Sequence, residues 1–144
     1  MSLETAEHLP AECAALYIAA LVDLAPVVLI SAAVPQQGGR NHLNEQWPSY
    51  WAALFHDHGY VAIDCVRPLI WTMPDVEWWY AQNTIVFAAA SHVEGHDGLK
   101  ALFERHGGPP LPLVHPARYG GIDSWAGELW RVRDEWRAYD AAKR

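Results

Sequence analysis

Residues Pro26 to Trp51 read PVVLISAAVPQQGGRNHLNEQWPSYW, and this stretch decides the fold of the chain. Its first part is an unbroken apolar run, which is typical of a strand covered on both faces of a parallel sheet. Pro35 ends the run, and a loop with two adjacent glycines follows. Ligands in open α/β sheets bind just beyond the carboxyl ends of such strands. We therefore expect the chemistry of this protein near His42, which lies in that loop.

Two amphipathic helices flank this strand. The first is predicted to begin at Pro10, a favourable first residue for a helix, and to stop before Pro26. Its expected buried face, spaced by three and four residues, consists of Cys13, Leu16, Tyr17, Ala20, Leu21 and Leu24. The second helix ends at Gly59, a natural left-handed cap. Its expected buried face consists of Trp47, Tyr50, Trp51, Leu54, Phe55 and His58.

Two further strands are predicted after the second helix. Tyr60 to Val66 alternates along a half-buried strand. Trp78 to Ala89 is predicted as a long third strand, with Gln82 and Asn83 on its opposite faces. The two strands are too close in sequence for a crossover helix, so we expect them to pair antiparallel. Together with the strand from Val27 to Ala33, they indicate an α/β domain with flanking helices.

The composition is that of a globular protein with an acidic first segment. The chain has 144 residues, of which 51% are hydrophobic, and a formal net charge of -7. Residues 1–91 contain 9 acidic and 2 basic side chains, whereas residues 92–144 contain 8 of each. Nucleic-acid binding draws on clustered Lys and Arg, so we expect no nucleic acid as the partner of the main domain.

Cysteine usage and hydropathy favour a cytoplasmic protein. Cys13 and Cys65 lack C-x-x-C spacing and are expected as buried thiols of a reducing compartment. The apolar run from Ala14 to Val34 has about the length that spans a bilayer, but Asp23 and Pro26 interrupt it. We interpret the run as a helix followed by a strand, and expect no membrane partner. The acidic start of the chain does not resemble a signal peptide.

The last third of the chain differs in composition. Residues 91–121 are rich in Gly and Pro, and are predicted to form a linker with a short helix near Leu99 to His106. His92 and His96 are expected in a solvated loop. Residues 122–144 are predicted to form an amphipathic C-terminal helix whose seam consists of Trp125, Leu129, Val132, Trp136 and Tyr139. This seam either docks on its own domain or forms a subunit contact.

Several short motifs carry a resemblance to a known family. They are SLETAEHLP (2–10), SAA (31–33), QGG (37–39), HLNEQWPSYW (42–51), DCVRPLIW (64–71) and WWYAQN (78–83). Together they resemble the second half of a class I S-adenosylmethionine-dependent methyltransferase, over roughly residues 1–90. The resemblance implies a partial Rossmann-like sheet. Residues 2–10 would follow the family's fourth strand, and the other motifs would belong to its fifth to seventh strands, the last two antiparallel.

The sequence lacks the features of the family's first half. That half binds the cofactor with a glycine-rich turn after strand one and an acidic residue after strand two. Neither is present, so we expect a truncated or split gene product. The resemblance implies methyl transfer from S-adenosylmethionine to a small polar or glycan-like acceptor, by a chain that is incomplete on its own. The alternative is a non-catalytic binding or structural subunit that pairs with another chain.

The resemblance also implies roles for individual residues. His8 and His42 are the candidate bases, which would take a proton from the acceptor or orient it. Glu4 and Glu7 would border the cofactor. The residues expected to contact the acceptor are Asn44, Glu45, Trp47 and Gln82.

Each role has a plainer alternative. Glu7 would cap or solvate the start of a helix, and His8 would only pack against its neighbours. Asn44 and Glu45 would accept hydrogen bonds from backbone donors ahead of the second helix. The aromatic cluster would pack in the core or line a pocket for a sugar or planar acceptor, and it consists of Trp71, Trp78, Trp79 and Tyr80.

Two carboxylates and two imidazoles also raise the question of a metal. The set Glu4, Glu7, His8 and His42 matches the ligands that small-RNA 2'-O-methyltransferases use for a divalent ion. Glu-x-x-Glu-His also occurs in metal-free methyltransferases of small molecules, and the acidic first segment lacks an RNA surface. We therefore expect no metal.

A partner chain is expected from the sheet itself. A sheet without its first strands leaves the edge at Val27 to Ala33 uncovered, and uncovered edges invite pairing. We expect a homodimer or pairing with a cofactor-binding chain.

Overall fold

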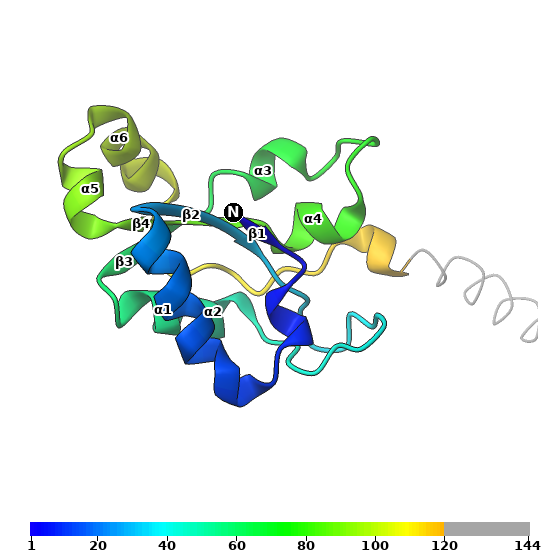
Figure 1. The fold of residues 1–144 in the computed structure, drawn as a ribbon. Helices are drawn as coiled ribbons and strands as arrows, with labels where there is room; N and C mark the ends of the chain where they lie inside the picture. The colour runs from blue at the N-terminus through cyan, green and yellow to red at the C-terminus, as the bar shows by residue number, and fades with distance from the viewer. Residues whose placement is uncertain (120–144) are drawn as a thin grey trace, which may run out of the picture.

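A sheet of four strands forms the centre of the structure, a computed structural model that describes residues 1–119 (Figure 1). The strands are β1 (Ser2–Leu3), β2 (Val27–Ser31), β3 (Tyr60–Ile63) and β4 (Ile85–Ala89). They lie in the order β1-β2-β4-β3. β1 is parallel to β2, whereas β4 is antiparallel to both of its neighbours. The predicted α/β class and the antiparallel pairing of the last two strands are therefore confirmed.

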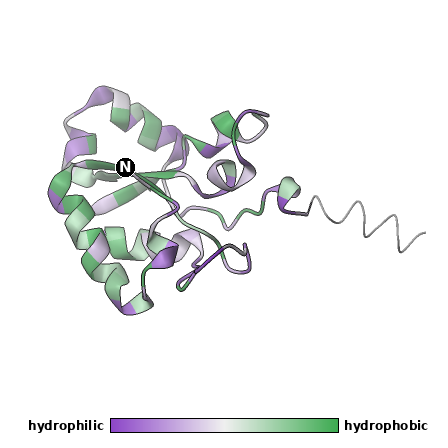
Figure 2. Cartoon of the chain, turned by 45° about the vertical axis from the view of Figure 1, so that its right-hand side comes forward, coloured by the Kyte–Doolittle hydropathy of each residue, from purple (hydrophilic) through white to green (hydrophobic). Residues whose placement is uncertain are grey.

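Helices cover both faces of this sheet (Figure 1). On one face lie α1 (Ala14–Leu24) and α2 (Pro48–His56). On the other face lie α3 (Arg67–Ile70), α4 (Trp78–Asn83), α5 (Ala90–Glu94) and α6 (Asp97–His106). Three 3-10 turns complete the described part: η1 (Ala6–His8), η2 (Ala11–Cys13) and η3 (Pro116–Tyr119). α1 is hydrophobic along most of its length, whereas the loop between β2 and α2 is mostly hydrophilic (Figure 2).

The larger part of the core lies between the sheet and the α1–α2 pair. Alternate strand residues face these helices, as the period of two along a strand requires. They are Val28, Ile30, Tyr60, Ala62, Ile85 and Phe87. The ring of Phe55 from α2 stacks on Phe87 with centroids 4.1 Å apart and planes 6° from parallel. The hydroxyl of Tyr60 donates to the carbonyls of Val22 and Ala25 at 3.1 and 2.9 Å, which attaches the end of α1 to β3.

The opposite face has a smaller apolar cluster and one buried cation. Ile63 and Ala88 pack there against Val93 of α5. Arg67 is fully buried, and its guanidinium donates to both carboxylate oxygens of Asp64 at 2.8 and 2.5 Å. The same guanidinium donates to the carbonyls of Gln82 and Leu111. A buried charge must be paired and hydrogen-bonded, and these four bonds meet that need while they connect α3, α4 and the segment after α6.

The first half of the predicted strand from Trp78 to Ala89 is wrong, because residues 78–83 form helix α4. Aromatic residues are enriched in strands, and this local preference misled the assignment. Tertiary contacts determine the conformation of residues 78–83 instead. Gln82 and Asn83 were expected on opposite faces, but both are buried and both donate to the side chain of Gln37. A strand could not direct two successive side chains to one partner.

The expected buried face of α1 is also partly wrong. Leu16 and Leu24 are 75% and 81% exposed, whereas Ala14 and Ile18 are buried. Nearly every residue of this helix is apolar, so the three/four spacing fits more than one face and cannot select the buried one. In α2 the expected burial of Trp51 and Phe55 is confirmed.

The remaining errors around α2 concern where this helix and the neighbouring strands begin and end. Trp47 and His58 lie outside α2 and are exposed. β2 and β3 end at Ser31 and Ile63, which is earlier than predicted.

The segment after β4 carries more helix than the sequence indicated. The helix expected near residues 99–106 corresponds to α6, but α5 precedes it and includes His92. His92 and His96 are therefore not in a loop together; their ring centroids lie 3.9 Å apart across the α5–α6 turn. The predicted helix of residues 122–144, with its seam of aromatic and aliphatic residues, lies outside the described residues.

Candidate functional site

The candidate site lies at the carboxyl ends of the two parallel strands, where the first turn of the chain meets the loop after β2 (Figure 1). β1 leads through Glu4 into η1, and β2 leads into the loop of residues 32–47. The backbone amides of Leu43 and Asn44 both donate to the carbonyl oxygen of Glu7, at 2.8 and 2.9 Å. These two bonds attach the loop to η1, and they bring His42 beside Glu7 and His8.

His42 is held in place by Glu45. Its Nδ1 lies 2.9 Å from Oε1 of that carboxylate, which can only accept, so Nδ1 carries the proton. Glu45 also accepts from the backbone amides of Gln36 and Gly38, at 2.7 and 3.0 Å. Burial alone would raise the pKa of Glu45, but these three hydrogen bonds outweigh it and lower the pKa below its ordinary value. Glu45 therefore acts as an ionised anchor for the imidazole and for the loop.

His8 faces His42 across the turn. The two rings are T-shaped, with centroids 4.9 Å apart. The Nδ1 of His8 lies 3.1 Å from the carbonyl oxygen of Asn41, a residue in the left-handed region with φ 62°. Gly39 makes room for the His42 ring, because a Cβ at this position would lie 2.3 Å from the Cε1 and Nε2 atoms of that ring. The loop backbone is thus shaped around the two imidazoles.

Glu7 is the most unusual residue of the site. Its side chain is fully buried, and neither carboxylate oxygen has a hydrogen-bond partner within the described structure. Burial raises the pKa of Glu7 above its ordinary value, and the neighbouring Glu4 carboxylate raises it further. An unsatisfied buried polar group costs about 1–3 kcal/mol, and a charged one costs more. The fold therefore maintains this carboxyl group at a cost in stability.

Glu4 belongs to a network of side-chain amides, of which Gln82 and Asn83 are buried. Its two carboxylate oxygens accept from Asn83 Nδ2 at 3.1 Å and from Gln37 Nε2 at 3.2 Å. Gln37 Oε1 in turn accepts from Gln82 Nε2 and Asn83 Nδ2, both at 2.9 Å. The backbone amide of His115 donates to Gln82 Oε1 at 2.8 Å. This network joins β1, the loop after β2, α4 and the segment after α6 behind the site.

A hollow of about 350 Å³ opens beside these groups. Its lining combines polar and aromatic residues, namely Glu4, Gln37, Gly38, Gly39, His42, Trp78, Trp79 and Tyr80. The rings of Trp78 and Trp79 are T-shaped with centroids 5.6 Å apart. A lining of aromatic rings together with a carboxylate, an amide and an imidazole offers both flat apolar surfaces and hydrogen-bonding groups to a ligand.

The residues singled out from the sequence divide into two groups. Glu4, Glu7, His8, His42 and Glu45 are brought together.

Three others lie elsewhere or are engaged. Trp47 is exposed and does not line the hollow. Asn44 is buried and accepts from Gln46 Nε2 at 2.9 Å, while its own Nδ2 has no partner within residues 1–119. Gln82 lies behind Gln37 in the amide network.

Sequence reasoning missed Gln37 and Asn83 as site residues. Gln37 stands in the QGG motif, and Asn83 directly follows Gln82. Their neighbours in the sequence could have drawn attention to them, but the buried network that unites them depends on α4 and could not be found from a strand assignment.

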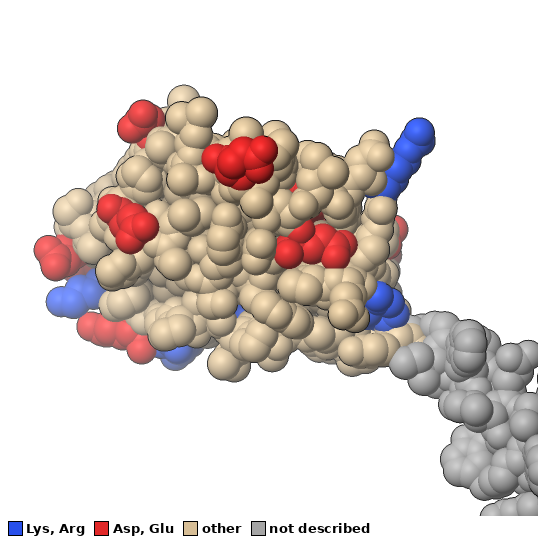
Figure 3. All heavy atoms as spheres, turned by 90° about the horizontal axis from the view of Figure 1, so that it is seen from below, with Lys and Arg blue, Asp and Glu red and all other residues tan. Residues whose placement is uncertain are grey.

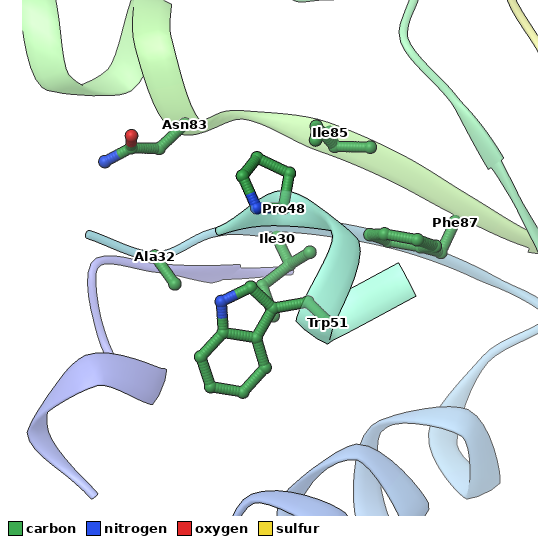
Figure 4. Close-up of a pocket in the computed structure, with 7 residues that line it drawn as sticks. All are labelled: Ile30, Ala32, Pro48, Trp51, Asn83, Ile85 and Phe87. Atoms are coloured by element: carbon green, nitrogen blue, oxygen red, sulfur yellow. The ribbon is translucent and has the colours of Figure 1, made fainter. Parts of the chain in front are cut away.

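A second cavity lies inside the apolar layer and has a structural explanation. It measures about 10 Å³ and is lined by Ile30, Ala32, Pro48, Trp51, Asn83, Ile85 and Phe87 (Figure 4). Trp51 Nε1 has no hydrogen-bond partner within the described residues. A cavity of this size holds at most one water, so it is a packing gap and no ligand site.

Figure 3 shows the face formed by α1 and α2, which is largely uncharged. Acidic and basic groups are scattered over it, and its described residues form no basic patch. None of the helices within residues 1–119 has the length and apolar character needed to cross a bilayer.

Comparison of the chain with protein-family models, with curated proteins and with solved structures found no match.

Proposed function

We propose that this chain is the acceptor-side half of a class I S-adenosylmethionine-dependent methyltransferase, acting on a small polar or glycan-like acceptor. The observation that carries the proposal is the pairing of an anchored imidazole with an aromatic hollow: His42, held by Glu45 at 2.9 Å, lines the same hollow as Trp78 and Trp79. A base and a binding surface for a hydroxyl-bearing acceptor thus adjoin each other.

Two further observations support the proposal. The antiparallel insertion of β4 between β2 and β3 agrees with the closing strands that the resemblance implies. The site also lies at the carboxyl ends of β1 and β2, which is where open α/β sheets bind ligands.

The residues present do not fit the cofactor on their own. Glycines that let a backbone approach a ligand must leave open space, but the space beside Gly39 is filled by the His42 ring. Gly38 stands in the loop after β2 and does not begin a helix. The methyl donor would have to be bound by protein surface beyond residues 1–119. What this chain contributes is therefore acceptor binding, orientation and a proton acceptor at His42 Nε2.

The proposal is tested with the full chain, S-adenosylmethionine and a panel of monosaccharides and nucleotide sugars. Binding of S-adenosylmethionine at micromolar affinity in titration calorimetry, with transfer of a labelled methyl group, would establish an autonomous enzyme. His42→Gln should then reduce transfer about 10²–10⁴-fold. The control His58→Gln changes an exposed residue outside the site and should leave transfer unchanged. If the chain alone neither binds S-adenosylmethionine nor transfers the methyl group, autonomous catalysis is ruled out.

A second candidate is a non-catalytic subunit that pairs with another chain, and the edge of the sheet favours it. β1 covers only Ile30 and Ser31, so residues 27–29 of β2 have no strand partner on that side within the described structure. Val27, which begins this edge, is exposed, and so is Leu24 at the end of α1. Sedimentation velocity should detect a dimer or larger species. A well-behaved monomer at high concentration would count against this candidate.

A further inference from the structure

We infer that His115 is a positioning residue for the candidate site, and that it holds the site in place only while its imidazole is neutral. His115 lies between α6 and η3 and is not among the residues that line the hollow. It acts on the hollow through the side-chain amide of Gln82. This role rests on the site of the proposed function, but it follows from hydrogen bonds and is tested without S-adenosylmethionine or an acceptor.

Both ring nitrogens of His115 have partners that fix the tautomer. Nε2 lies 2.7 Å from the carbonyl oxygen of Trp71, which can only accept, so Nε2 carries the proton. Nδ1 accepts from the backbone amide of Ala117 at 3.1 Å, so Nδ1 carries a lone pair. Both nitrogens of a charged imidazole are donors. Only the neutral ring can therefore make these two bonds at the same time.

The surroundings of the ring offer no counter-charge to its protonated form. No carboxylate oxygen of residues 1–119 lies within 4.0 Å of either ring nitrogen, because both ion pairs found there join other residues. Of the elements nearby, α3 carries Arg67, which is paired with Asp64, and α4 carries no charged residue. η3 itself carries the cation Arg118.

The aromatic neighbour of the ring does not remove this conflict. The ring centroids of His115 and Trp71 lie 4.7 Å apart, and an aromatic ring attracts a cation at such a distance. That attraction does not replace the lone pair which the amide of Ala117 needs. A proton on Nδ1 would place two donors against each other, so the bond between His115 and Ala117 would break.

The backbone of His115 connects this ring to the site. Its amide donates to Gln82 Oε1 at 2.8 Å, and the described residues offer that oxygen no other hydrogen bond. Gln82 is fully buried, and its Nε2 donates to Gln37 Oε1 at 2.9 Å. The amide of His115 thus determines which end of the Gln82 side chain faces Gln37. Because Gln37 lines the hollow, a change at His115 reaches the hollow through one buried side chain.

The two ring bonds explain why protonation would move the backbone as well. One bond attaches the ring to the carbonyl of Trp71, and the other attaches it to the first turn of η3. Together they fix the orientation of residue 115 and hence of its amide. When the bond to Ala117 breaks, the amide of His115 is no longer held toward Gln82, and the buried Oε1 atom loses its donor.

The experiment is an NMR titration of the full chain from neutral to acid pH. An imidazole ordinarily takes up its second proton between about pH 5 and 8, and the titration continues until the ring of His115 is charged. We expect the backbone amide signal of Ala117 and the side-chain amide signals of Gln82 and Gln37 to shift with the midpoint of that ring. The control His58→Gln removes an exposed imidazole elsewhere and should leave this midpoint unchanged.

His115→Asn is the decisive variant. The side-chain oxygen of Asn accepts from the backbone amide two residues further on, so it can replace Nδ1 as the acceptor for Ala117 without titrating in this range. The signals of Gln82 and Gln37 should then keep their neutral positions at acid pH. His115→Phe has no acceptor, and its signals should resemble those of the acid form at every pH.

Two outcomes overturn the role of His115. The first is a ring that becomes charged without any shift of the Gln82 signals. The second is a shift that persists in His115→Asn, because another titrating group such as His42 would then be its cause. No methyl donor enters the titration, so its result is independent of whether the chain transfers a methyl group.

Discussion

Two neighbouring regions of the molecule, the layer between the sheet and α1–α2 and the loop after β2 with η1, have opposite physical character. On the α2 side lies an apolar layer, in which Phe55 stacks on Phe87 and the strands alternate inward and outward as expected. On the β2 side lies a polar region with a buried carboxyl group, two imidazoles and residues with positive φ. The apolar layer stabilises the fold, whereas the polar region costs stability. A protein retains such a cost where function requires it, which is why we place the site there.

The largest expected effect belongs to the apolar layer. Phe55→Ala would leave a cavity beside Phe87 and should lower the free energy of unfolding by about 3–5 kcal/mol. Leu16→Ala in α1 is the control, because Leu16 is exposed and its loss should change stability by less than about 0.5 kcal/mol. Urea unfolding measures both. Similar effects for the two variants would contradict the layer described here.

A smaller loss is expected from the polar region. Gly39→Ala introduces a Cβ in the left-handed region, at φ 149°, and directs it into the His42 ring. Stability should fall by about 1–3 kcal/mol, and the ring should leave Glu45. Gly38→Ala also places a side chain at positive φ, at 75°, but its Cβ meets open space. NMR signals of His42 should therefore shift in Gly39→Ala and stay in place in Gly38→Ala.

The smallest effect has the opposite sign. Glu7→Gln should raise the stability of the chain by about 1 kcal/mol at neutral pH, because it removes a buried carboxylate that has no hydrogen-bond partner within residues 1–119. The folded state holds a proton on Glu7 at pH values where the unfolded chain has released it. Wild-type stability should consequently fall as the pH rises from the ordinary pKa of 4.5 through the raised folded value, and this slope should diminish in Glu7→Gln.

Thermal unfolding between pH 4 and 8 measures this difference. Equal pH slopes for the two proteins would mean that Glu7 is solvated or paired in solution.

The sequence predicted the α/β class, the positions of three of the four strands and the concentration of polar residues after β2. These features follow from local patterns: an unbroken apolar run for β2 and a glycine after α2. Helix α4 could not be predicted, because aromatic residues prefer strands and only contacts to Gln37 reveal a helix. The site could be predicted only in part. His42 and Glu45 are neighbours in sequence, but the burial of Glu7 depends on contacts between η1 and the loop.

The amide network behind the site has a consequence for the order in which the molecule forms. Asn83 reaches Glu4 across 79 residues of chain and Gln37 across 46. Phe55 and Phe87, by contrast, are separated by a much shorter stretch. Contacts between distant residues carry the larger entropy of loop closure and are expected to form late. We therefore expect the bonds of the amide network to form later than the stacking of Phe55 on Phe87.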